Sequence, residues 1–93
     1  MHAVFIEVNI TREQAERARP GLQVLDMPRL RTLGAVSAVF LAPEDDRAVG
    51  VVVFEEERMA RRAARALRVG SQAGPSPTIT FRTVQVREVL GHL

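Results

Sequence analysis

Two uncharged stretches separated by a short polar segment place the strongest constraint on the fold of this chain. Ala35 to Ala42 reads AVSAVFLA and Ala48 to Phe54 reads AVGVVVF, whereas Pro43 to Arg47 is a polar reversal of hairpin length. A strand without charge on either face is typical of a strand that is covered on both sides. We therefore expect two antiparallel strands here, with neither face left to water.

The segments before this hairpin predict a strand and then a helix. Ala3 to Ile10 alternates residue by residue with the two-residue period of a strand. Thr11 then forms an N-cap signal with Gln14, because the threonine hydroxyl can accept the N–H three residues on and the glutamine can return the bond. A helix is expected to begin at this threonine.

Prolines and glycines predict that this helix is kinked or built in two pieces. Pro20 and Gly21 interrupt it, because proline removes a backbone donor and crowds the preceding turn. The apolar periodicity resumes beyond them, so Pro28 marks either a first helical turn or a further bend. Gly34 is the expected C-terminal stop.

A second helix and a last strand follow the hairpin. Three glutamates, Glu55 to Glu57, suit the positive end of a helix that is expected to stop at Gly70. Ser71 to Pro77 reads as a loop, and Thr78 to Leu90 as a strand. The apolar parity of this strand changes near Thr83, which predicts a bulge or a break.

The order βαββαβ over 93 residues predicts one domain, 1–93, of the α+β class. Its simplest form is a ferredoxin-like four-stranded antiparallel sheet with two helices on one face. The other face is expected to be apolar as well, so that something must cover it. We therefore expect a homodimer with twofold symmetry that pairs two sheets face to face.

Composition excludes several classes of function. The chain has no cysteine and only two histidines, His2 and His92, near its two ends, so no metal site is expected. No uncharged stretch is long enough to cross a membrane, and the start of the chain has no secretory signal pattern, so we expect a cytoplasmic protein without a membrane partner. The net charge of +2 is small, so it gives little electrostatic attraction toward nucleic acid.

Nucleic-acid binding is not expected either, although βαββαβ is also the order of an RNA-recognition domain. Arg47 to Phe54 partly matches the third-strand octamer of that domain. Val49 and Val51 occupy the two positions at which aromatic rings would stack on bases. The surface that would carry most of the affinity is therefore missing.

The chain resembles the dimeric α-β barrel proteins, in their antibiotic-biosynthesis-monooxygenase-like branch. The likeness covers nearly the whole chain and lies in the element order and in four segments: Met27 to Arg31, Leu33-Gly34, Arg47 to Phe54 and Val86 to Leu90. It implies sheets paired into a barrel, C-terminal segments often exchanged between subunits, and a small hydrophobic ligand between helices and sheet. It implies no cofactor for the members that are cofactor-independent monooxygenases, whereas other members degrade haem.

The activities of that family depend on an asparagine near the end of the first strand, with tryptophan and with tyrosine or histidine elsewhere in the cleft. Asn9 matches the asparagine by position, but the chain has no tryptophan or tyrosine. We therefore expect a homodimer that binds a small apolar molecule, and whether it is an enzyme stays open. The alternatives are a monooxygenase-like enzyme and a non-catalytic structural or regulatory dimer.

Three residues that share one face of the first strand are the candidate ligand-binding residues: Phe5, Glu7 and Asn9. Asn9 could orient a ligand carbonyl, or could instead bond to nearby backbone where the chain enters the helix. Glu7 could act as a base. It could equally pair with an arginine such as Arg82 or Arg87, or be exposed. The sequence does not decide which sheet face these residues occupy.

A stripe of arginines on the second predicted helix is the remaining candidate. It could bind phosphate or an acidic partner, but glutamates three and four residues earlier favour ordinary pairs on a solvated surface. Glu57 is expected to pair with Arg61, and Glu55 with Arg58. The stripe consists of Arg58, Arg61, Arg62, Arg65 and Arg68.

Overall fold

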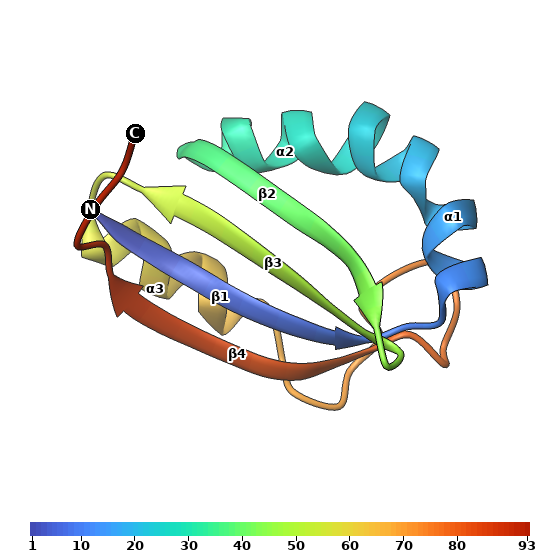
Figure 1. Ribbon diagram of the computed structural model, residues 1–93. Coiled ribbons are helices and arrows are strands. Elements are labelled where there is room, and N and C mark those ends of the chain that lie inside the picture. Colours follow the sequence, from blue (N-terminus) through green and yellow to red (C-terminus); the bar gives the residue numbers. More distant parts are fainter.

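The computed structural model describes residues 1–93 and contains four strands and four helical segments, in the predicted order along the chain. These elements are β1 (His2–Asn9), α1 (Arg12–Gly21), η1 (Leu22–Asp26), α2 (Met27–Thr32), β2 (Ala35–Glu44), β3 (Arg47–Phe54), α3 (Glu57–Arg65) and β4 (Thr80–Glu88). The strands form one antiparallel sheet in the order β2-β3-β1-β4 (Figure 1). The predicted ferredoxin-like α+β fold is confirmed. None of the helices has the length and apolar character needed to span a bilayer.

The first helix begins where the sequence predicts. Thr11 is the N-cap, and its hydroxyl accepts the N–H of Gln14 at 3.1 Å. The glutamine side chain accepts the N–H of Thr11 at 2.9 Å, which completes a capping box. Two backbone donors that a helix N-terminus leaves without partners are thereby satisfied.

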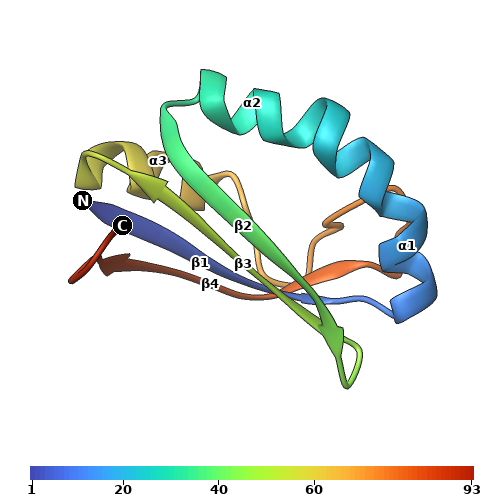
Figure 2. The ribbon, with the colours of Figure 1, turned by 45° about the horizontal axis from the view of Figure 1, so that its top comes forward.

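The interruption of this helix takes the form of a π-helical segment. Pro20 lies within the last turn of α1, and η1 follows it without a break in the chain of helical residues. The N–H of Met27 donates to the carbonyl of Leu22, five residues back. Pro28 lies in the first turn of α2, one of the two places predicted for it, and the helix is bent at the interruption and not divided into two separate pieces. Figure 2 shows the three segments as one bent helical run beside β2.

The hairpin turn is shorter than predicted. β2 continues through Glu44 and β3 begins at Arg47, so only Asp45 and Asp46 form the turn. Both aspartates have positive φ, 53° and 58°. Two left-handed residues make the tight turn that matches the twist of the flanking strands, and this allows the strands to pair almost to their ends.

The second helix ends earlier than the predicted stop at Gly70. Its last residue is Arg65, and the next N–H groups make shorter-range bonds to carbonyls three residues back. The N–H of Gly70 donates instead to the carbonyl of Phe81 at 2.7 Å. The chain thus leaves the helix to lie along the outer edge of β4. Arg68 consequently lies beyond the helix.

The change of parity in the last strand is a β-bulge, as predicted. Glu7 pairs with Thr83, whereas Val8 pairs with Phe81, so Arg82 is the extra residue. The strand itself, Thr80–Glu88, is shorter at both ends than the predicted Thr78 to Leu90. Residues 78 and 79 belong instead to the preceding loop, where the carbonyl of Ile79 accepts the N–H of Ala73.

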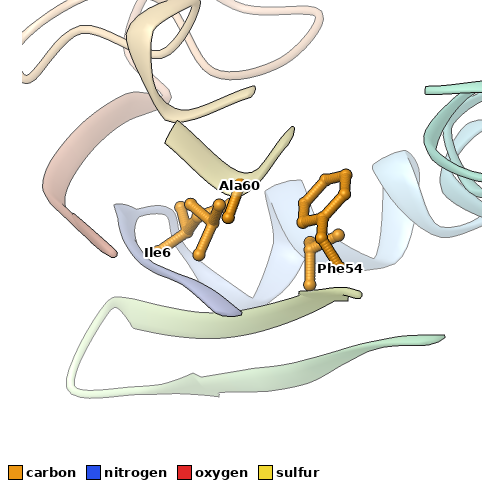
Figure 3. Close-up of a cluster of buried hydrophobic side chains, with 5 residues drawn as sticks. Ile6, Phe54 and Ala60 are labelled. Carbon is orange, nitrogen blue, oxygen red and sulfur yellow. The ribbon is translucent and has the colours of Figure 1, made fainter. Parts of the chain in front are cut away.

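The core lies between the sheet and α3. Ala60 of α3 has no exposed surface and points at Ile6 and Phe54 of the sheet (Figure 3). Its methyl side chain lets the helix approach the strands closely. Leu30 of α2 packs on the same buried cluster, so both helices cover one face of the sheet.

The opposite face of the sheet, called the open face here, has no helix over it; in Figure 1, α3 lies behind β1 and β3. Successive side chains of a strand point to opposite faces of the sheet. Since Val4, Ile6 and Val52 belong to the core on the helix side, the residues that alternate with them lie on the open face. The registers place in it Ala3, Phe5, Glu7, Asn9, Ser37, Val39, Leu41, Arg47, Val49, Val51, Val53, Thr80, Thr83, Gln85 and Arg87. Its β2 and β3 half is mainly apolar, with Ser37 and Arg47 at its two ends, whereas the β4 side is polar.

Two glycines with positive φ allow the packing of α2 against α3 to be tested. Gly34 has φ +102°, and a Cβ there would overlap the terminal carbon of Met59 in α3. Gly70 has φ +86° and nothing within 4 Å of a Cβ. We expect Gly70→Ala to lower the free energy of unfolding by about 1 kcal/mol, from backbone strain alone.

Gly34→Ala should lower it by at least as much, because the backbone has the same strain and the methyl group also displaces the flexible end of Met59. Urea unfolding followed by circular dichroism measures both values. A smaller effect of Gly34→Ala than of Gly70→Ala would contradict the close contact between Gly34 and Met59.

Candidate functional site

The three residues predicted to bind a ligand, Phe5, Glu7 and Asn9, lie on the open face. They alternate with Val4 and Ile6, which belong to the core cluster. The sheet thus separates them from the space between helices and strands. No finding tests their role in binding, which stays a prediction.

Glu7 is held by two neighbours on β4. The hydroxyl of Thr83 donates to its Oε1 at 2.9 Å, and the Nε of Arg82 lies 3.6 Å from the same oxygen. The bulge places this arginine beside the carboxylate. The Glu7 side chain is 25% exposed. Of the two arginines named as partners, Arg82 is therefore the one that pairs with Glu7.

Asn9 and Phe5 also have partners from β4. The Asn9 amide donates to the hydroxyl of Thr80 at 3.1 Å, across the paired strands and not to its own turn. The guanidinium carbon of Arg87 lies 5.5 Å from the centre of the Phe5 ring, within the range of a cation–π contact. The polar side of the open face is thus a set of side chains that bind one another.

A polar hollow of about 380 Å³ lies where α1 begins, beside the β2–β3 turn. Gln14 donates to the hydroxyl of Thr78 across it at 2.8 Å. Its lining combines two arginines with two aspartates and one apolar residue: Asn9, Ile10, Thr11, Gln14, Asp45, Asp46, Arg47, Thr78 and Arg82. Of the three predicted residues it includes Asn9 alone.

A larger groove, of about 490 Å³, lies between the helical run and β2, and we call it the α2–β2 groove. Five of its eight lining residues are apolar: Gln23, Met27, Leu30, Arg31, Ala35, Val36, Ser37 and Ala38. Ala35 and Ala38 of β2 present only small side chains to this space, so they fill little of it. Local sequence patterns do not predict this groove, because its lining comes from a helical run and a strand that are brought together only in the folded chain.

The C-terminal tail meets the same strand. After β4 the N–H of Val89 donates to the carbonyl of Met1, and the Nε2 of His92 lies 3.1 Å from the hydroxyl of Ser37. The tail therefore crosses from β4 to β2 at one end of the sheet (Figure 1). His92, near the end of the chain, thus contacts a residue that lines the α2–β2 groove.

The arginines of α3 form a solvated surface, as the alternative predicted. Arg61 is bonded to Glu57 at 2.7 Å, whereas Arg58 pairs with Glu56 and not with Glu55. The hydrogen bond and charge of Arg61 hold the pKa of the Glu57 carboxyl below its usual value, and the charge of His2 adds to this. Glu57 is the first residue of α3, so its carboxylate also complements the positive end of the helix.

Comparison with models of known protein families finds no match, and neither do the comparisons with curated proteins and with solved structures. The proposal of a function therefore depends on the fold and on the geometry of these surfaces alone.

Proposed function

We propose that the protein is a homodimer of the dimeric α-β barrel type, working in the cytoplasm, which binds a small apolar molecule in the α2–β2 groove. The groove carries the ligand part of this proposal. It is mainly apolar, its volume lies within the usual range for small-molecule sites, and it has few polar groups. It also lies between helices and sheet, where the resemblance places a ligand.

The π-helical segment adds support for this location. Gln23 of η1 lines the groove, and η1 ends just before Met27, another lining residue. A π-helical segment is rare and frequently lies at a functional site. It changes the phase of the helix, and so determines which side chains of α2 turn toward β2.

The lining groups favour binding over catalysis. The eight residues include no carboxylate, histidine or tyrosine beside the apolar surface. Asn9 and Glu7, on which the monooxygenase alternative depends, lie on the open face and are bonded to Thr80 and Thr83. We therefore propose a binding protein as the function of this site.

The exposed surface of a single chain supports the homodimer. The chain exposes 6479 Å², whereas a folded monomer of its mass, 10.3 kDa, is expected to expose about 5,350 Å². The excess is comparable with the roughly 800 Å² that one partner buries in a standard interface. Val39 and Leu41 of the open face are 50% and 58% exposed, so a second copy would remove apolar surface from water.

A charge on the open face tests the dimer. Val39→Glu should leave the isolated chain folded, since this side chain is half exposed, but should weaken dimerisation about 100-fold or more, because it places an unpaired carboxylate in an apolar interface. Light scattering at micromolar concentration should give a mass of twice 10.3 kDa for the wild-type protein and of 10.3 kDa for Val39→Glu.

Val24→Glu is the matched control, because Val24 is 70% exposed on η1, away from the sheet. It should leave the dimer intact. A monomeric wild-type protein, or equal masses for the wild type and Val39→Glu, would contradict the proposed interface.

A bulky side chain in the groove tests the ligand site. Val36 lines the groove and is 45% exposed, so Val36→Trp should fill part of the space with little effect on folding. We expect it to weaken binding of 2-naphthamide, a neutral apolar probe, at least about tenfold in isothermal titration calorimetry.

Val69→Trp is the control, since Val69 is exposed in the loop after α3 and does not line the groove. It should bind the probe as the wild type does. An equal loss in both variants, or no saturable binding to the wild type, would contradict the groove as the site.

A further inference from the structure

The α2–β2 groove contains one charged residue, Arg31 of α2. We propose that the molecule bound there carries a carboxylate or a similar anionic group that pairs with the Arg31 guanidinium; this inference rests on the proposed binding function. The ligand is accordingly a small amphipathic anion, with an apolar body and one charged end.

The charge of Arg31 has no partner within the protein. Arg31 forms no ion pair, and no aspartate or glutamate lines the groove. Six other arginines do form ion pairs with glutamates: Arg12, Arg17, Arg19, Arg58, Arg61 and Arg82. A guanidinium remains charged at every physiological pH. The groove therefore presents a permanent positive charge that an anionic ligand can neutralise.

The surroundings strengthen such a contact. Met27, Leu30 and Val36 supply apolar surface beside the guanidinium, and a bound apolar body would exclude water from it. Exclusion of water makes a charge-assisted hydrogen bond stronger than the same bond in solvent. The planar guanidinium can also donate two parallel N–H groups to the two oxygens of one carboxylate.

The remaining polar groups fit one anionic end. Gln23 carries an amide that can donate, and the hydroxyl of Ser37 is already engaged with His92. No lining group is an obligate acceptor for a cationic ligand. A ligand with a positive end would therefore meet repulsion from Arg31 without compensation, whereas a neutral ligand would leave the guanidinium dehydrated and unpaired.

A pair of probes that differ only in charge tests this inference. 2-Naphthoate and 2-naphthamide have nearly the same shape, and only the first is an anion. Isothermal titration calorimetry of the wild-type protein should show that the naphthoate binds about tenfold more tightly than the amide, as expected for a hydrogen bond to a charged group.

Two variants on one helix then locate the effect. Arg31→Gln should abolish this preference by weakening naphthoate binding about tenfold. Arg29→Gln is the matched control, because Arg29 is also an exposed, unpaired arginine of α2 but does not line the groove. It should retain the full preference. Thermal unfolding verifies that both variants remain folded.

Three other outcomes would contradict this inference, alone or together with the proposed binding function. If the amide binds saturably and as tightly as the naphthoate, the proposed apolar site stands and the anionic ligand is excluded. If Arg31→Gln and Arg29→Gln weaken naphthoate binding equally, the effect comes from overall charge and the role of Arg31 is excluded. If neither probe binds, the proposed binding function fails and this inference fails with it.

Discussion

The sheet has apolar side chains on both faces, but the helices of one chain cover only one of them. Ala60 and Leu30 seal the face that contains Val4 and Phe54. On the other side, Val39 and Leu41 of β2 are 50% and 58% exposed. This imbalance explains why so few side chains of the single chain are fully buried, and why a second copy is the simplest cover for the open face.

The same arrangement leaves a separate space on the helix side. The helical run packs on the core cluster through Leu30, while Ala35 and Ala38 of β2 have side chains too small to fill the space beside it. The α2–β2 groove follows from these two features. A dimer formed through the open face would leave most of the groove accessible, because Ser37 is the one lining residue that the strand registers also place on that face.

Local signals in the sequence predicted much of the fold. Thr11 with Gln14, the glycine at position 34 and the parity change near Thr83 each correspond to the expected feature: a capping box, a left-handed helix stop and a bulge. The end of α3 was missed because it depends on a distant bond, from the N–H of Gly70 to the carbonyl of Phe81. The helix propensities of the residues in this segment do not depend on that bond, so they could not predict where α3 ends.

The candidate site could be predicted from the sequence less well than the fold. Parity grouped Phe5, Glu7 and Asn9 correctly, but both faces of β1 carry apolar residues, so it could not say which face meets the helices. The α2–β2 groove needs the relative position of a helix and a strand, which no local pattern specifies. Arg31 was for this reason not identified as a candidate.

Solvent contact of the valine methyl groups tests the central claim most directly, since the open face is either covered or not. A soluble paramagnetic agent broadens the NMR signals of methyl groups that water can reach. We predict that Val39, Val49 and Val51 are protected at micromolar concentration, while Val24 and Val69, exposed elsewhere on the chain, are broadened. Equal broadening of all five would mean that the open face lies in water and that the homodimer does not form.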